Sequence, residues 1–79
     1  YNLKAYLNLA KSYLGRYSFN EALETLEKLE NINANYEIEE VILLRAKCFK
    51  ESYDIEKTIE NLSKVIEINK NNWEAYNIL

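Results

Sequence analysis

The sequence predicts an all-α fold built from repeated helical hairpins, and three observations point to it. Apolar residues recur at spacings of three and four along most of the 79 residues, which is typical of amphipathic helices. Proline is absent and glycine occurs once, so few helix breakers interrupt these segments. The pattern of residues 6–37 also returns at residues 42–73, which indicates that one structural unit occurs twice.

The first predicted helix runs from Leu3 to Gly15. A turn at residues 15–17 follows, and Ser18 with Glu21 forms a capping-box pattern that announces the second helix. In that pattern the serine hydroxyl accepts from the glutamate N–H, and the glutamate side chain accepts from the serine N–H. We expect the second helix to bury one apolar face, which consists of Phe19, Ala22, Leu23, Leu26 and Leu29.

The second hairpin follows a polar turn at residues 31–35, whose asparagines suit the left-handed conformation that ends helices. A third helix is predicted from about Glu37 to Glu51, and Asp54 is a suitable N-cap for a fourth. The expected buried residues of these helices are Val41, Ile42, Ala46, Cys48 and Phe49, then Ile55, Ile59, Leu62, Val65, Ile66 and Ile68. A second polar turn at residues 69–72 precedes a fifth helix that starts at Trp73. Because this helix is cut off at Leu79, we expect the chain to be a fragment of a longer protein.

Residues 6–37 and 42–73 align with an offset of 36 positions. Identical pairs occur at Ala10/Ala46, Lys11/Lys47, Tyr17/Tyr53, Glu24/Glu60, Leu26/Leu62, Lys28/Lys64, Ile32/Ile68, Asn33/Asn69 and Asn35/Asn71. Many other pairs exchange one apolar residue for another, such as Phe19/Ile55 and Leu23/Ile59. The agreement extends to the turn lengths, which chance similarity between two amphipathic helices does not explain. The sequence therefore predicts two copies of one hairpin that stack on each other.

This pattern resembles the tetratricopeptide repeat family. The first copy reads Tyr6-x-x-Leu9-Ala10-x-x-Tyr13 on its first helix and Ala22-x-x-x-Leu26 on its second. The second copy reads Ile42-x-x-Arg45-Ala46-x-x-Phe49 and Thr58-x-x-x-Leu62. A third copy begins with Tyr76-x-x-Leu79. The resemblance implies a right-handed α-solenoid of antiparallel helix-turn-helix units, with two full hairpins and part of a third. It implies a single domain over residues 1–79, in which repeat one is 3–35, repeat two is 37–72, and 73–79 is the truncated first helix of repeat three.

The sequence departs from the family pattern at several places, and Ala34 and Lys70 stand where the family has its terminal proline. Tyr17 and Tyr53 stand where a glycine is usual in the hairpin turn. A tyrosine in the left-handed conformation costs about 1 kcal/mol or more, so we expect these turns to differ in detail. Arg45 replaces a leucine, and we expect its side chain to reach a carboxylate such as that of Glu60.

Composition and charge argue against several classes of function. The net charge of −3 disfavours a nucleic-acid surface, which needs a basic face. No apolar run approaches the length of a membrane span and no signal peptide is visible, so we expect a cytoplasmic protein with no membrane partner. The chain has no histidine and one cysteine, and its single glycine cannot form a phosphate-binding loop. We therefore expect no enzyme activity, no cofactor and no metal site, and we expect Cys48 to be a buried apolar residue.

The resemblance implies a protein-protein interaction scaffold or adaptor, which binds a peptide or partner helix on a concave face lined by the first helix of each repeat. The positions on this face are Lys4, Leu7, Asn8, Lys11, Leu14, Glu40, Leu43, Leu44, Lys47 and Lys50, and the truncated helix adds Glu74, Asn77 and Ile78. An apolar stripe flanked by Lys11 and Lys47 suits a peptide with acidic and apolar residues. The carboxylate clamp found in some family members is not matched, because Leu7, Lys11 and Leu44 replace its lysine and asparagines.

Several alternatives remain open at this point. The leucines of the stripe can instead pack against neighbouring repeats, and the repeats then act as structural spacers within a larger multi-subunit assembly. The truncated third repeat leaves Tyr76 and Leu79 partly uncovered, so the isolated chain can self-associate through this helix. An RNA-binding helical repeat is a further alternative, which the acidic balance and the Ala/Tyr packing pattern disfavour.

Overall fold

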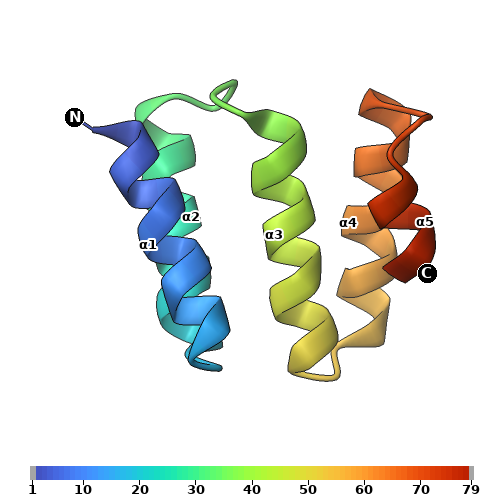
Figure 1. Ribbon diagram of the computed structural model, residues 1–79, viewed down its shortest axis with the longest axis horizontal. Coiled ribbons are helices and arrows are strands. Elements are labelled where there is room, and N and C mark those ends of the chain that lie inside the picture. The colour runs from blue at the N-terminus through green and yellow to red at the C-terminus, as the bar shows by residue number, and fades with distance from the viewer. Residues whose placement is uncertain (1, 79) are drawn as a thin grey trace.

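The computed structural model describes residues 2–78, which form five α-helices (Figure 1). Their bounds are α1 Leu3–Gly15, α2 Phe19–Ile32, α3 Ile38–Glu51, α4 Ile55–Ile68 and α5 Trp73–Ile78. α1 packs on α2 and α3 packs on α4 as antiparallel hairpins, α2 also contacts α3, and α5 packs on α4. The prediction of an all-α fold with paired helices is confirmed. Leu79, the last residue of the predicted fifth helix, lies outside the described residues.

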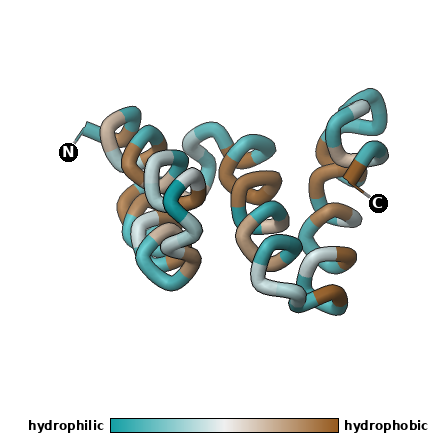
Figure 2. Tube along the Cα trace, turned by 60° about the horizontal axis from the view of Figure 1, so that its bottom comes forward, coloured by the Kyte–Doolittle hydropathy of each residue, from teal (hydrophilic) through white to brown (hydrophobic). Residues whose placement is uncertain are grey.

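The two hairpins stand side by side along the longest axis, and α5 lies against α4 at the C-terminal side (Figure 1). The α1–α2 and α3–α4 turns lie at one edge of the molecule, and the α2–α3 and α4–α5 connections lie at the opposite edge. Figure 2 shows that hydrophobic residues recur within the helices, while the connections are mostly hydrophilic. This order brings successive odd-numbered helices next to one another, which matters for the site described below.

Two clusters of buried apolar side chains hold the helices together. They consist of Leu7, Ala10, Leu26, Leu29, Val41 and Leu44, and of Ile42, Leu43, Ala46, Leu62, Val65 and Ala75. α3 contributes to both clusters, and its residues 41–44 are all buried. A helix with neighbours on two sides needs apolar residues around most of its circumference. Each fully buried leucine or isoleucine contributes about 1.5–3 kcal/mol relative to an exposed one.

The two hairpin turns have the same backbone, and each places a tyrosine in the left-handed region. Tyr17 has φ 61° and Tyr53 has φ 63°. In the first turn the Ser18 N–H donates to the Tyr13 carbonyl at 2.8 Å, and the Tyr17 N–H donates to the Leu14 carbonyl at 3.0 Å. The second turn repeats both bonds at 2.9 and 3.1 Å, so each is a Schellman motif. The tyrosines therefore adopt the strained backbone, at about 1–2 kcal/mol each, and the turn keeps its shape.

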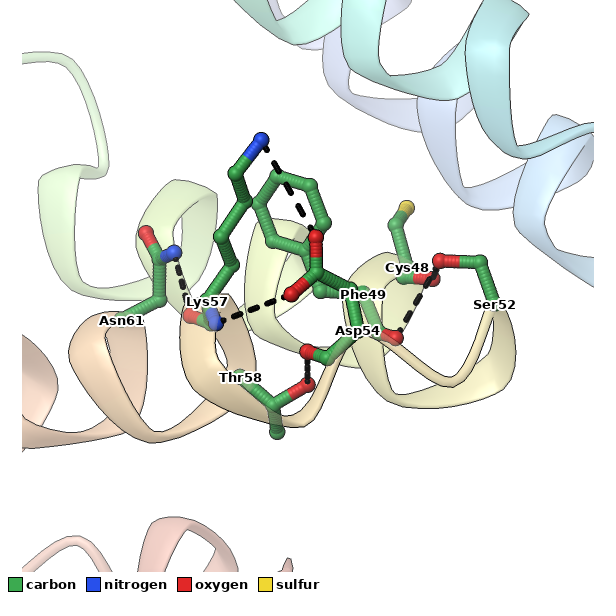
Figure 3. Close-up of polar contacts among 7 residues, drawn as sticks. All are labelled: Cys48, Phe49, Ser52, Asp54, Lys57, Thr58 and Asn61. Atoms are coloured by element: carbon green, nitrogen blue, oxygen red, sulfur yellow. Dashed lines mark hydrogen bonds and ion pairs between the residues drawn. The ribbon is translucent and has the colours of Figure 1, made fainter.

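The capping box predicted at Ser18 does not form. Ser18 is the N-cap of α2, but its side chain makes no cap hydrogen bond. Its N–H, which a capping box requires for Glu21, already donates to the Tyr13 carbonyl in the preceding turn. The predicted N-cap Asp54 is confirmed, because its carboxylate accepts from the Lys57 N–H at 3.2 Å (Figure 3). A negative charge at this position also interacts favourably with the helix dipole.

The asparagine-rich connections end their helices differently from the prediction. Asn33 and Asn69 are the C-caps of α2 and α4, and both have an extended backbone where a left-handed one was expected. The side-chain carbonyl of each accepts from the N–H two residues further on, at 3.0 Å in both connections. This local hydrogen bond turns the chain without a positive φ. The left-handed residue of the first connection is Glu37, the N-cap of α3.

The apolar face predicted for α4 is buried only in part. Ile55, Ile59 and Ile68 are exposed, contrary to the prediction. The buried positions include Thr58 and Asn61, whose side chains donate to carbonyls four residues earlier, at 2.7 and 2.8 Å (Figure 3). These bonds allow two polar side chains to be buried without an unpaired donor. Ile55 and Ile59 lack a neighbour because α4 has α3 on one side and only the short α5 on another, whereas Ile68 is exposed like its equivalent Ile32 on α2.

Candidate functional site

The ten residues predicted to line a binding face do not share one environment. Leu7, Leu43 and Leu44 are buried within the two apolar clusters. The other seven have exposed or half-buried side chains: Lys4, Asn8, Lys11, Leu14, Glu40, Lys47 and Lys50. The burial of the three leucines favours the alternative in which the stripe packs within the molecule, because a core side chain is not available to a partner.

A cleft of about 340 Å³ opens where the odd-numbered helices meet. It is lined by the end of α1 and its turn, by the end of α3 and by α5, with the residues Leu14, Gly15, Tyr17, Lys47, Lys50, Glu51, Glu74 and Ile78. Of the ten residues, the structure brings Leu14, Lys47 and Lys50 together here, and the other seven do not line this cleft. Of the three positions predicted on the truncated helix, Glu74 and Ile78 line it as well. We call this feature the cleft below.

The sequence did not predict Gly15, Tyr17 or Glu51 as residues of the cleft, and of these Tyr17 has the large apolar side chain. Its side chain is 71% exposed, and its ring meets the Phe19 ring edge-on with 6.1 Å between centroids. A signal was present in the sequence, because a tyrosine occupies a turn position that favours glycine in both hairpins. Strained backbone conformations concentrate at functional sites, so an exposed aromatic ring on such a turn is a candidate contact for a ligand.

The two lysines predicted to flank the apolar stripe are both paired with carboxylates. Lys11 Nζ lies 2.5 Å from Glu40 Oε1, between α1 and α3. Lys47 Nζ lies 2.5 Å from Glu74 Oε2, between α3 and α5. These partly exposed pairs contribute about 0–1 kcal/mol each, but they neutralise the lysines. Within residues 2–78 Lys50 has no ion-pair partner, so it is the cation of the cleft that remains for an acidic ligand.

Arg45 pairs with Glu30 of α2. The predicted carboxylate partner therefore exists, but it is not Glu60, which pairs with Lys64 along α4 at 3.7 Å. Burial lowers the pKa of Arg45, and the nearby Glu27 carboxylate opposes this shift. Among the described residues the buried Glu30 Oε1 has no hydrogen-bond partner besides this ionic contact. The guanidinium therefore compensates the burial of that carboxylate.

Cys48 is unsuited to nucleophilic chemistry. Its predicted burial is confirmed. Burial raises the pKa of the thiol to about 11, so little thiolate is present at neutral pH. Elsewhere in residues 2–78, no three side chains of Cys, Asp or Glu converge in a way that could hold a metal ion.

Two further findings concern membrane spans and known proteins. In the part of the chain that the structure describes, no helix combines the length and the apolar character that a membrane span needs. Compared with protein-family models, curated proteins and solved structures, the chain shows no significant match. The interpretation of function therefore depends on the cleft and on the surfaces around it.

Proposed function

We propose that the chain is a protein-binding module whose hairpins are tetratricopeptide-like units of an α-solenoid, and that the cleft binds a peptide. The proposal is supported by the position of the cleft, to which α1, α3 and α5 all contribute. First helices of successive units line one concave face in such a solenoid. The shared Schellman turns and asparagine C-caps of the two hairpins are further support.

The observation that carries the proposal is the exposed Tyr17 ring in the cleft on a left-handed turn. Its ring offers stacking and apolar contact, and its hydroxyl offers a hydrogen bond. Leu14 and Ile78 add apolar surface, and the unpaired Lys50 adds a positive charge. These groups suit a peptide segment in which an acidic residue lies close to an apolar or aromatic one.

Peptides selected from a display library against the full chain provide the test, with affinities measured by calorimetry. Tyr17→Gly removes the ring while glycine accepts the left-handed backbone, so the variant is expected to fold. We expect its peptide affinity to fall at least tenfold, a loss of about 1.4 kcal/mol. Tyr53→Gly is the matched control, because it makes the same change at the same turn position outside the cleft. Equal affinity of Tyr17→Gly and wild type would refute the proposal.

A structural spacer within a larger assembly is the second candidate function. It is favoured by the burial of Leu7, Leu43 and Leu44, which removes the predicted apolar stripe from the surface. In this case the chain contributes rigid spacing and uses its exposed helix faces for assembly. The display experiment separates the two candidates, because a spacer is expected to yield no peptide that depends on Tyr17.

A further inference from the structure

A groove lies between the two hairpins, where α2 and α4 stand on either side of α3 (Figure 1). It consists of two adjoining hollows of about 610 and 400 Å³, which share Leu23 of α2 and Phe49 of α3 in their lining. The first hollow continues to the two hairpin turns and the start of α4, and the second continues along α2 to Asn31. All of the lining lies within residues 17–57, so both walls of the groove belong to the described chain.

The floor of the groove already holds a positively charged group. Phe19, Leu23 and Phe49 are half-buried apolar residues that line it. The Lys57 ammonium lies over the Phe49 ring, 5.3 Å from its centre, and 3.9 Å from Asp54 Oδ2 (Figure 3). An ammonium that lies near both an aromatic face and a carboxylate is attracted by both. The groove therefore has the chemistry of a cation-binding surface, and Lys57 is a cation that it accommodates.

The charges of the groove do not balance. Four carboxylates and two cations line it: Glu21, Asp54, Glu27 and Glu30, with Lys57 and Arg45. Lys57 pairs with Asp54, and Arg45 pairs with Glu30. Glu21 and Glu27 are exposed and form no ion pair within residues 2–78. Four negative charges against two positive ones leave a net charge of −2, which favours a cationic partner.

The two carboxylates without an ion pair set the spacing of such a partner. Glu21 lines the first hollow and Glu27 the second, and Leu23 lines both. Glu27 follows Glu21 by six positions, which corresponds to about 9 Å along the axis of α2. An extended peptide advances about 3.3 Å per residue, so residues three positions apart span about 10 Å. A peptide with two cationic residues at this spacing can therefore contact both carboxylates.

We propose that this groove binds an extended segment of a partner protein, in which two arginines stand three positions apart with an apolar residue between them. One guanidinium pairs with Glu21 and the other with Glu27, and the apolar side chain lies against Leu23 and Phe49. Arginine suits the groove better than lysine, because a planar guanidinium both pairs with a carboxylate and stacks on an aromatic ring.

The groove is a second interaction surface, distinct from the cleft. Tyr17 lines both features, but Glu21, Leu23, Glu27 and Phe49 line the groove and not the cleft. The two surfaces also select opposite charges, because the cleft offers an unpaired lysine and the groove offers unpaired carboxylates. The test therefore changes residues of the groove that the cleft does not use.

The test titrates the full ¹⁵N-labelled chain with the blocked synthetic peptide Gly-Arg-Leu-Gly-Arg-Gly at physiological ionic strength. We expect saturable amide shifts at Leu23, Glu27 and Phe49. The matched control peptide, Gly-Leu-Arg-Arg-Gly-Gly, has the same composition and charge but adjacent arginines, which reach only one of the two carboxylates. We expect it to bind more weakly, and equal affinity of the two peptides would overturn the proposed spacing.

Two variants with equal loss of charge separate specific pairing from general attraction. Glu21→Gln/Glu27→Gln is expected to weaken binding of the first peptide roughly tenfold, because both charge-assisted contacts are lost. Glu24→Gln/Glu67→Gln removes two other exposed carboxylates that do not line the groove, and it is expected to bind as wild type. Equal weakening by the two double variants would overturn the proposal, since net charge alone would then explain the binding.

Lys57 provides a test in the opposite direction. Lys57→Gln removes the ammonium that occupies the Phe49 ring and releases the Asp54 carboxylate, so we expect the peptide to bind more tightly. Lys64→Gln is its matched control, because it removes another exposed and paired lysine of α4 outside the groove. An equal gain in both variants would contradict a cation site at Phe49.

An absence of saturable shifts at the groove would refute the proposal outright. The outcome is separable from that of the cleft, because Glu21→Gln/Glu27→Gln leaves every residue of the cleft in place. We expect this variant to bind peptides selected for the cleft as wild type does. Failure at one surface is therefore distinguishable from failure at the other.

Discussion

The turn that joins α1 to α2 and the turn that joins α3 to α4 share one backbone, yet the hairpins that they close differ on their outer surfaces. Between the hairpins, Arg45 of α3 pairs with Glu30 of α2. With the offset of 36, the equivalents of these residues are Leu9 on α1 and Ile66 on α4, both apolar. A repeated apolar pattern thus selects the face of each helix that packs. The neighbouring helix decides whether that face is covered, and whether apolar or charged side chains cover it.

The connections that follow the two hairpins diverge in the same way. Leu3 and Tyr36 are half-buried against the first apolar cluster. Their equivalents in the second hairpin are Glu39 and Asn72, and the Glu39 Oε1 accepts from the side-chain amides of Asn69 and Asn72 at 2.9 and 2.7 Å. Hydrogen bonds to a charged group contribute about 1.5–3 kcal/mol. Equivalent backbone positions are therefore held by apolar contact in one hairpin and by polar contact in the other.

The largest change in the free energy of unfolding is expected at the ion pair between the hairpins, because charged residues there stand where the equivalent positions are apolar. Glu30→Ile or Arg45→Leu alone leaves one partly buried charge without its partner, and we expect each to lower the free energy of unfolding by about 1–3 kcal/mol. The double variant installs the two apolar residue types found at the equivalent positions and is expected to recover most of this loss. Urea unfolding of the four proteins measures the coupling. Losses that simply add would show that the pair itself contributes nothing.

A smaller change in the free energy of unfolding is expected at the two hairpin turns, where Tyr17 and Tyr53 have the same left-handed backbone. Tyr53→Gly is expected to raise the free energy of unfolding by about 1 kcal/mol, because glycine has no Cβ to oppose a φ of 63°. Tyr17→Gly is expected to gain less, because it loses the edge-on contact with Phe19, which is worth about 0.5–1.5 kcal/mol. Denaturant unfolding distinguishes the two variants. A loss of stability in both would contradict the strain argument.

The smallest effect concerns Cys48, whose equivalent in the first hairpin is the exposed Ser12. Burial raises the pKa of this thiol from 9.0 to about 11, so the folded chain holds the thiol proton more tightly than the unfolded chain does. The resulting stability is complete below about pH 9 and is lost as the pH rises towards about 11. Cys48→Ala is expected to reduce this decline in urea midpoints between about pH 9 and about pH 11, the range that the two pKa values span, with no change in slope near pH 7. An equally steep decline in the variant would assign it to other groups.

Local information determined the helices and their pairing. The predicted first helix agrees with α1, and Asp54 caps α4 as predicted, because hydrophobic periodicity and N-cap preference act within a few residues of one another. The 36-residue offset also determined that both turns have the same shape. Of the residues that line the cleft, the sequence predicted five, since the face of a helix follows from residue spacing alone: Leu14, Lys47, Lys50, Glu74 and Ile78.

Tertiary structure decided what each of these faces meets. The apolar pattern marks Leu7 and Ile59 alike, but Leu7 is buried between helices and Ile59 is exposed, because burial depends on the neighbour and not on the residue. The same holds for polar groups. The Ser18 N–H donates to a carbonyl of the preceding turn and not to the predicted capping box, and the Lys47 ammonium is neutralised by the Glu74 carboxylate of α5. Hydrogen bonds and ion pairs across helices join residues distant in sequence, so only the packed chain determines which partner each group finds.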